Sequence, residues 1–401
     1  MPHPWGPPTR PPHSNQVVAS NRVPPPPAIA SRPRLPVTFR PQMAKGRVGI
    51  LTSGGDCSGL NAVIASVVKV GIPMGYEFVG FERGWEGVLS PITCRPLGLS
   101  DVRGISFIGG TILKTTNRGR FGGKVGAGGV RRIPDDILEM AKSNLQEVGI
   151  DALVVIGGDG TLNAALQLEE FGVKIIGVPK TIDNDLMATD RTFGFSTAVQ
   201  VVTDALDRIH TTASSHSRIL FLETMGRHAG WIALRAGLAG GADAILLPEF
   251  PFKVHDLMEF LRYRQEQYGS SIVVVAEGAM IDDRQVIQAG GKSSEVLLGG
   301  VSTEVMRTLE EMAPGEFEMR GTVLGHVQRG GTPNPADRIL AKAYGVEAIK
   351  AVDRGESGVM VAYQNQEMCT VPIADACGQL KTVRNDTMEY VTARDLGVFI
   401  H

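Results

Sequence analysis

Short apolar segments alternate with helical patterns over most of the chain. Apolar runs occupy residues 48–51, 152–156 and 174–178, and helical spacing follows the first two, at 60–70 and 162–171. Further apolar runs lie at residues 219–222, 244–247, 272–276 and 323–324. Short runs that are bounded by glycine and alternate with helices are typical of parallel sheets. The pattern predicts an α/β fold of two Rossmann-like three-layer domains with mostly parallel sheets.

Composition excludes several classes of protein. The chain is 43% hydrophobic and 20% charged, its formal net charge is -2, and no stretch approaches 18 consecutive apolar residues. We therefore expect neither a membrane span nor a nucleic-acid partner. The four cysteines form no C-x-x-C pair, which indicates a reducing compartment, and we expect a cytoplasmic protein.

The first 43 residues differ from the rest. Residues 1–42 contain 13 prolines and five arginines but no Asp or Glu. Because proline stops helices and cannot donate to a sheet, this tail is predicted to be disordered. An inert tail, or translation that starts at Met43, is favoured over an organelle transit peptide, since the segment lacks amphipathic helical spacing.

Two glycine-rich clusters follow predicted strands, where ligands of parallel sheets bind. Gly54 and Gly55 precede a helix, so backbone N–H groups there can approach a phosphate, although such pairs also occur for steric reasons alone. Residues 157–161 read Gly-Gly-Asp-Gly-Thr and place Asp159 inside a second such loop. An anion beside phosphates requires a cation between them, so Asp159 is a candidate Mg²⁺ ligand. The alternative is a helix cap.

A third cluster, Thr-Ile-Asp-Asn-Asp at residues 181–185, follows the third strand. Asp183 and Asp185 can point at one locus, with one acting as general base and the other helping to hold a metal. An Asx-turn is the simpler explanation of this sequence. Acidic residues in both loops favour a metal–phosphate site.

A second region is basic. It contains Arg218, Arg227, Arg320, His326 and Arg329. Arginine forks bind phosphate monoesters through two hydrogen bonds, although a lone arginine is more often a surface ion pair. Glu277, which follows a buried strand, can accept hydrogen bonds from sugar hydroxyls. Together, the acidic and basic regions permit phosphoryl transfer to a phosphosugar.

These motifs resemble those of the 6-phosphofructokinases over about residues 47–391. The matching segments are 52–56, 157–160, 179–185, 225–227 and 320–338, which stand in the family's order. The resemblance implies an active site in the cleft between two domains. The phosphate-donor domain would comprise residues 44–194 and about 328–370. The sugar-phosphate domain would comprise residues 195–327 and about 371–401.

The resemblance also implies roles for residues of the donor region. Asp183 would take the proton of the sugar 1-hydroxyl, Asp159 would bind Mg²⁺ with support from Asp185, and Thr181 would contact the transferred phosphoryl group. Arg118 would stabilise that group and touch the donor. The remaining donor contacts would be Gly55, Trp85, Gly158, Gly160, Thr161 and Lys180, with the Trp85 ring against adenine.

Further roles concern the sugar phosphate. Met225, Gly226, Arg227 and Glu277 would bind the sugar, and His326 and Arg329 its 6-phosphate. Arg218 and Arg320 would reach the 6-phosphate of a neighbouring subunit, which implies a homodimer or homotetramer. The family's bacterial effector positions correspond to Ala65, Lys69, Glu266 and Tyr268, of which only Lys69 is basic, so an effector is not implied.

The donor depends on two positions. Pyrophosphate-dependent relatives usually have Asp and Lys where this chain has Gly160 and Lys180, whereas typical bacterial ATP-dependent enzymes have Gly at both. Gly160 leaves space for the α-phosphate of ATP, and Lys180, as a flexible cation, excludes neither donor. We therefore expect MgATP as the donor and fructose 6-phosphate as the acceptor in glycolysis, with a pyrophosphate-dependent enzyme as the alternative. A lipid or NAD kinase and an inactive regulatory subunit are more distant alternatives.

Overall fold

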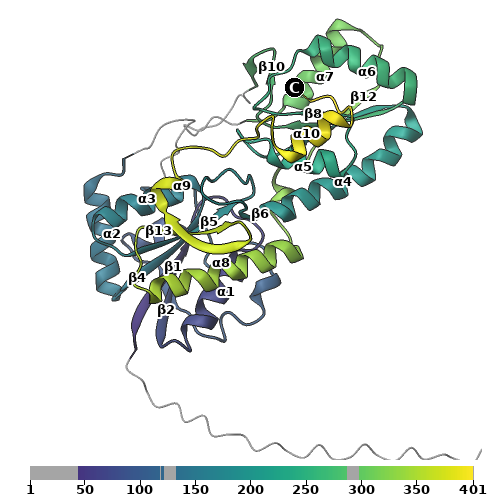
Figure 1. Ribbon diagram of the computed structural model, residues 1–401. Coiled ribbons are helices and arrows are strands. Elements are labelled where there is room, and N and C mark those ends of the chain that lie inside the picture. The colour runs from purple at the N-terminus through teal and green to yellow at the C-terminus, as the bar shows by residue number, and fades with distance from the viewer. Residues whose placement is uncertain (1–43, 118, 122–131, 287–297, 401) are drawn as a thin grey trace, which may run out of the picture. The chain divides into compact units, whose positions relative to one another are not determined.

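The computed structural model describes residues 44–117, 119–121, 132–286 and 298–400 (Figure 1). The predicted disordered tail and Arg118 lie outside these residues. The described part contains a larger and a smaller sheet with helices on their faces, together with a two-stranded sheet, and most strand pairs are parallel. The predicted α/β class with mostly parallel sheets is confirmed, while the domain boundaries stay a prediction.

The larger sheet has eight strands within the described residues. In sheet order they are β14 (Glu367–Pro372), β13 (Val359–Gln364), β5 (Ile175–Thr181), β4 (Ala152–Gly157), β1 (Gly46–Thr52), β2 (Tyr76–Phe81) and β3 (Cys94–Pro96), with β6 (Phe193–Gly194) paired to β5. The pairs β13–β14 and β2–β3 are antiparallel, and the others are parallel.

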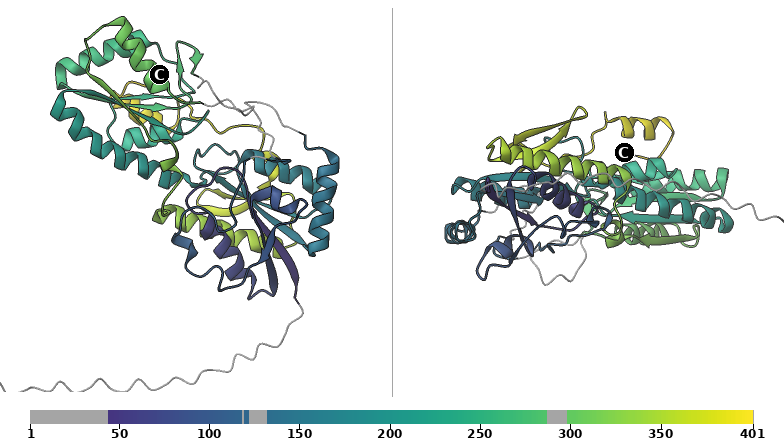
Figure 2. Two further views of the ribbon diagram at one scale, coloured as in Figure 1. Left: turned by 180° about the vertical axis from the view of Figure 1, so that it is seen from behind. Right: turned by 90° about the horizontal axis from the view of Figure 1, so that it is seen from below.

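Both faces of this sheet are buried, because successive side chains of a strand alternate between them. Ile50 belongs to an apolar cluster with α1 (Leu60–Gly71) and α8 (Pro335–Asp353), which pack against each other. Leu51 belongs to the opposite cluster, with α2 (Asp135–Val148) and α3 (Asp159–Glu170). The helices on the two faces are visible in Figures 1 and 2. This is the three-layer arrangement that the continuous apolar strands predict.

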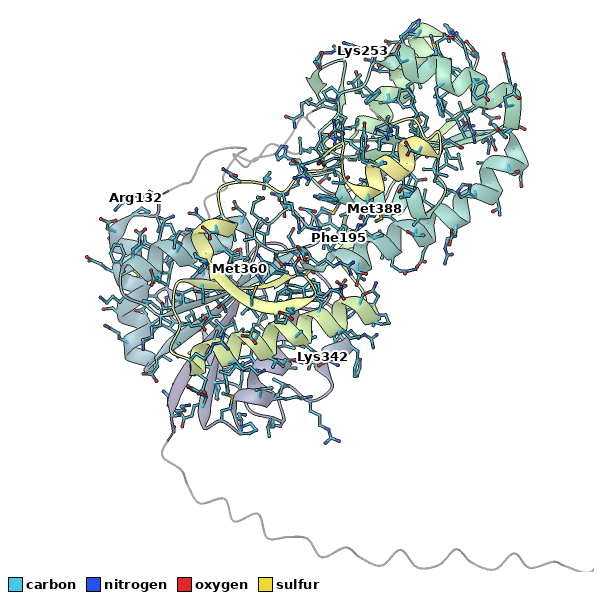
Figure 3. All side chains as sticks on the ribbon, in the orientation of Figure 1. Arg132, Phe195, Lys253, Lys342, Met360 and Met388 are labelled. Carbon is cyan, nitrogen blue, oxygen red and sulfur yellow. The ribbon has the colours of Figure 1, made fainter. Side chains whose placement is uncertain are left out.

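The smaller sheet is parallel throughout and has the order β12 (Met319–Val323), β7 (Ile219–Thr224), β9 (Ser271–Ala276) and β8 (Ala244–Leu246). One face packs on α4 (Phe195–His216) and α5 (Trp231–Ala239), and the other on α6 (Val254–Tyr268) and α7 (Val301–Met312). Phe195, which is labelled in Figure 3, begins α4 and is buried.

The C-terminal part of the chain contributes to both sheets. β13 extends the larger sheet, where its Met360 is fully buried (Figure 3). Residue Phe399 then pairs with Ala244 of β8 in the smaller sheet. The remaining elements are the short helices η1 (Gly84–Val88), η2 (Ile105–Phe107), η3 (Gly325–Gln328), α9 (Ile373–Ala376) and α10 (Met388–Asp395), and the strands β10 (Met280–Ile281) and β11 (Arg284–Gln285).

The predicted strands agree with the structure except near residue 323. The apolar pair 323–324 suggested a strand there, but β12 begins earlier, at Met319. β12 is an edge strand with mostly exposed residues, so no buried apolar run marks it. Among the described residues, no helix is both long and apolar enough to cross a bilayer.

Candidate active site

Three loops of the donor region meet at one edge of the larger sheet. Thr52 of β1 is paired with Ile156 of β4, and Gly157 of β4 with Pro179 of β5, so these strands end side by side. The N–H group of Ser53 extends this pairing by donating to the carbonyl of Ile156, at 3.0 Å. The three clusters that follow these strands therefore lie next to one another.

Close contacts explain two of the glycines. A Cβ atom at Gly157 would lie 2.3 Å from the Cβ of Thr161, and one at Gly55 would lie 1.8 Å from a guanidinium nitrogen of Arg329. Gly160 differs, since among the described residues nothing lies within 4 Å of its Cβ position. The protein therefore needs glycine at 157 for packing, whereas a side chain at 55 would displace the end of Arg329, and the exposed position 160 has room for one.

Three carboxylates lie together at these loops. Asp183 is only 7% exposed, and its Oδ1 atom accepts no hydrogen bond from any described residue. Burial, and then the charge of Asp183, raise the pKa of Asp185 to about 6, with a smaller contribution from Asp159. Like charges this close disfavour simultaneous ionisation unless a cation joins them. The locus therefore favours positive charge, to which the neighbouring Lys180 contributes.

The residues present fit one kind of metal site. Within the described residues, no group of three or more His, Cys, Asp or Glu side chains is arranged to hold an ion. Mg²⁺, however, is usually held by one or two carboxylates together with phosphate oxygens of the substrate. Asp159, which begins α3, and the unsatisfied carboxylate of Asp183 suit that mode of binding.

Lys180 lies inside the donor region. It is 5% exposed, and its ammonium group donates to the carbonyl of Gly55 at 2.5 Å. Burial is the main cause that lowers its pKa, and Arg329 lowers it further, while Cys57 and Asp183 oppose the shift. The expectation of a flexible cation is wrong, because this contact ties the end of β5 to the first glycine loop.

The sugar loops lie at the carboxyl ends of β7 and β9. Gly226 and Arg227 both have positive φ, at 142° and 52°, which is costly for a non-glycine residue and is often found at functional sites. The Oε1 atom of Glu277 accepts from the N–H of Arg227 at 3.1 Å. A Cβ at Gly278 would lie 1.8 Å from the Arg227 carbonyl, so the two loops touch.

The sugar loops and the donor loops influence each other. Burial, and next the charge of Asp183, raise the pKa of Glu277 to about 7. Burial and the charge of Arg227 lower the pKa of His228, and the charge of Asp183 opposes this shift. Asp183 of the larger sheet and Glu277 of the smaller sheet are therefore close enough to interact, as a shared site requires.

His326 and Arg329 follow β12 at the same end of the smaller sheet. His326 lies in η3 and is exposed, and the side chain of Gln328 accepts from the backbone of Met225. The Arg329 guanidinium lies against Gly55, and its Nε atom donates to no described residue. Arg329 thus has donor capacity available where the two regions meet.

Arg218 and Arg320 lie elsewhere. They flank the beginnings of β7 and β12 and share the carboxylate of Glu318, at 2.6 and 3.2 Å. Met225 follows the opposite end of β7, whose six residues span about 20 Å at 3.3 Å per residue. The structure therefore does not bring these two arginines to the site of their own chain.

Trp85 is less accessible than expected. Its ring is 4% exposed and stacks on Phe121 with the centroids 4.8 Å apart. Contact with adenine would require Phe121 to leave that face, so this role of Trp85 stays a prediction. Arg118 lies outside the described residues.

One contact was missed from the sequence. The backbone N–H of Gly378 donates to Oδ1 of Asp159 at 3.0 Å, so the segment after α9 reaches the candidate metal ligand. No apolar strand precedes this glycine, and the rule that placed the other loops at strand ends could not identify it.

Comparisons with known proteins agree with this geometry. Residues 47–352 match the family model described as phosphofructokinase. The chain is 49% identical, over 88% of its length and 97% of the relative's, to an ATP-dependent 6-phosphofructokinase of Chloroflexus aurantiacus. It is 48% identical, over 86% of its length and 98% of the relative's, to a pyrophosphate--fructose 6-phosphate 1-phosphotransferase of Amycolatopsis methanolica.

A solved structure of phosphofructokinase from Saccharomyces cerevisiae is also similar, with a TM-score of 0.69 and 32% identity. The match covers 82% of this chain but 45% of the yeast chain, so this chain spans less than half of that relative. The family match covers most of the described residues and includes both sets of loops. The chain therefore belongs to the phosphofructokinase family.

Proposed function

We propose that the protein is an ATP-dependent 6-phosphofructokinase of glycolysis. It transfers the γ-phosphoryl group of MgATP to the 1-hydroxyl of D-fructose 6-phosphate and releases fructose 1,6-bisphosphate and ADP. The observation that carries the proposal is the buried, unsatisfied Asp183 carboxylate, which lies between phosphate-type glycine loops and the Arg227–Glu277 pair. The relatives named ATP-dependent 6-phosphofructokinase support the same activity.

Asp183 acts as the general base. Its Oδ1 atom has no hydrogen-bond donor among the described residues and is therefore available to the sugar hydroxyl. Its backbone N–H donates to the Thr181 hydroxyl at 3.0 Å, which orients Thr181 beside it for contact with the transferred group. The transition state of phosphoryl transfer is loose, so positioning and charge neutralisation contribute more than base strength.

Positive charge comes from two arginines and a metal ion. Arg227 supplies a cation from the sugar side, and Arg118 supplies one from the donor side. Mg²⁺ would be held by Asp159 with support from Asp185, and when bound it neutralises charge on the donor phosphates. The mutual repulsion of the buried carboxylates supports a cation at this place.

ATP is proposed as the donor because position 160 is open. Glycine leaves that space for the α-phosphate, whereas a carboxylate there would add bulk and negative charge. Lys180 donates to the Gly55 carbonyl, so in this arrangement it serves the packing of the loops. It therefore need not indicate pyrophosphate.

Pyrophosphate is the second candidate donor. Relatives named as pyrophosphate-dependent enzymes are 48% identical to the chain, almost the same as the ATP-dependent ones. Overall identity thus does not discriminate between the donors, and position 160 decides the choice between them.

Self-association is part of the proposal. Arg218 and Arg320 lie at the far end of β7 from their own site, and both are paired with Glu318 at the surface. We propose that they bind the 6-phosphate in the site of a second copy of the chain. His326 and Arg329 would bind the same phosphate from within that copy. A cytoplasmic location belongs to the same proposal.

A coupled assay tests the activity and the donor together. Production of fructose 1,6-bisphosphate is measured with ATP and with pyrophosphate in parallel, each with and without Mg²⁺. We expect turnover with MgATP that exceeds turnover with pyrophosphate. A preference for pyrophosphate would overturn the donor assignment, and no product with either donor would overturn the function.

A further inference from the structure

The segment 377–383, which we call the strap, lies across several loops of the site. Besides the bond from Gly378 to Asp159, its Leu380 forms a bridge to Leu186, which follows Asp185. Further along, the N–H of Val383 donates to Oε1 of Glu249 at 2.8 Å. That carboxylate also accepts from the N–H of Gly230, just before α5. The strap thus touches the donor loops and the beginning of α5.

Lys381 makes the densest set of these contacts. Its backbone N–H donates to the carbonyl of Asp185 at 2.8 Å, and its carbonyl accepts from Nε1 of Trp231 at 2.7 Å. Its ammonium group donates to the carbonyls of Thr189 and Asp190, at 2.8 and 3.1 Å. One residue therefore binds the loop 181–190 at its middle and at its C-terminal end, and joins it to another element.

Both elements that Lys381 contacts, loop 181–190 and the beginning of α5, carry or adjoin residues of the candidate site. Loop 181–190 carries Thr181, Asp183 and Asp185, so a shift of its backbone moves the base. Trp231 is the first residue of α5, four residues after Arg227. The hydrogen bonds of Lys381 therefore set the position of the base-carrying loop relative to the chain that follows the sugar loop.

We propose that Lys381 is a positioning residue for phosphoryl transfer, which holds the loop 181–190 in register with α5. This inference rests on the proposed function and adds to it a residue beyond the family match, which ends at residue 352. Lys381 is not itself the base, because its ammonium group donates to the backbone carbonyls of Thr189 and Asp190. Its effect is thus expected in kcat rather than in substrate affinity.

Kinetics of Lys381→Met test the proposal, because methionine keeps the length of the chain but removes the charge and the donors. A displaced reacting group can lower the rate by up to about 10²-fold. We expect kcat to fall at least about tenfold while KM for fructose 6-phosphate stays within about threefold of the original value. Lys381→Arg, which keeps a cationic donor, should recover part of the lost rate.

The matched control is Lys342→Met. Lys342 is an exposed lysine on α8 (Figure 3), and we expect this variant to keep the original kcat. Equal losses in the two methionine variants, or a kcat for Lys381→Met within about threefold of the unmutated protein, would overturn the proposal. Absence of activity in the unmutated protein would instead contradict the proposed function.

Hydrogen exchange supplies a readout that does not depend on activity. In Lys381→Met, amides of residues 182–190 should exchange faster, while amides of β7 should be unchanged. Should this variant fail to fold, Trp231→Phe removes the donor to the Lys381 carbonyl, together with part of the buried indole ring, and should show the same changes to a smaller degree. Unchanged exchange of the loop in the folded variants would overturn the positioning role.

Discussion

The donor region and the sugar region use opposite charges at the ends of two parallel sheets. The donor region gathers buried carboxylates, with Asp183 unsatisfied and the pKa of Asp185 raised to about 6 by burial and by Asp183. The sugar region gathers arginines and histidine, and its charged groups are mostly exposed. Under the proposed function, the buried set helps to hold a cation and the exposed set binds an anion. The difference between the regions thus matches a metal–donor complex on one side and a phosphosugar on the other.

The two regions also differ in whether a single chain brings all of their residues together. The donor loops meet through contacts within one chain, such as the bond from Lys180 to Gly55. The basic residues of the sugar region are divided between two ends of the smaller sheet, with Arg329 at one end and Arg320 at the other. A single chain therefore assembles the donor side by itself, whereas under the proposed function a second copy completes the basic set.

Asp183→Asn should produce the largest effect, because it removes the base from the donor region without changing its shape. Loss of a positioned base lowers kcat by about 10²–10⁴-fold. The same change should raise the melting temperature of the unliganded protein at pH 8 by about 1–3 °C, since it removes an unsatisfied buried charge. Steady-state kinetics and thermal unfolding measure the two effects, and near-normal kcat would contradict the assignment.

Arg218→Ala and Arg320→Ala should weaken the sugar side alone. Each removes a charged hydrogen bond worth about 1.5–3 kcal/mol, so KM for fructose 6-phosphate should rise about 10- to 100-fold while KM for ATP changes little. Arg307→Ala, on the exposed face of α7, is the control.

Mixing experiments sharpen this prediction. When Arg320→Ala and Asp183→Asn chains exchange subunits, some hybrid sites contain both an intact base and an intact arginine. Activity should then reappear in the mixture. If subunit exchange is demonstrated and no activity returns, the arginines do not act across an interface.

Gly160→Asp should alter the donor side alone. The new carboxylate has space in the protein but would lie toward the α-phosphate of ATP, so kcat/KM for ATP should fall at least tenfold, or about 1.4 kcal/mol. Gly160→Ala, which adds a methyl group without charge, should change it less. An unchanged kcat/KM for ATP in the Asp variant would show that position 160 does not select the donor.

The smallest effect concerns pH. The pKa of Glu277 is raised to about 7, first by burial and then by Asp183, so the folded protein holds this proton more tightly than the unfolded chain does. Its contribution to stability is complete below the unfolded pKa of about 4.5 and is lost as pH rises through about 7. The melting temperature should fall by about 2–4 °C between pH 5 and pH 8. Glu277→Gln should reduce this dependence, and an identical pH profile in that variant would contradict the prediction.

Much of the donor region could be predicted from the sequence because buried parallel strands are apolar on both faces. The runs that became β1, β4 and β5 are continuous, and the polar residues after them lie at one sheet edge by geometry alone. Residues such as Gly55, Asp159 and Asp183 could therefore be assigned from the sequence to the ends of neighbouring strands. Their individual chemical roles came from the family resemblance.

Other features depend on tertiary contacts without a local signal. The start of β12 carries exposed polar residues, so its pattern does not differ from a loop. Burial of Lys180 depends on the neighbouring Gly55 loop, and stacking of Trp85 depends on Phe121, which is 36 positions away. The strap is recognised through backbone hydrogen bonds, which any residue type can form.

The return of residues 359–399 to both sheets has a consequence for synthesis of the chain on the ribosome. β5 finds its neighbour β13 only after residue 364 has been made, and β8 finds Phe399 later still. Although domains often fold in order as they emerge, during early translation the larger sheet lacks β13 and β14 and the smaller sheet lacks its bridge from β8 to Phe399. A nascent chain that ends near residue 350 would therefore expose an open edge on each sheet, which is the kind of surface that chaperones protect from aggregation.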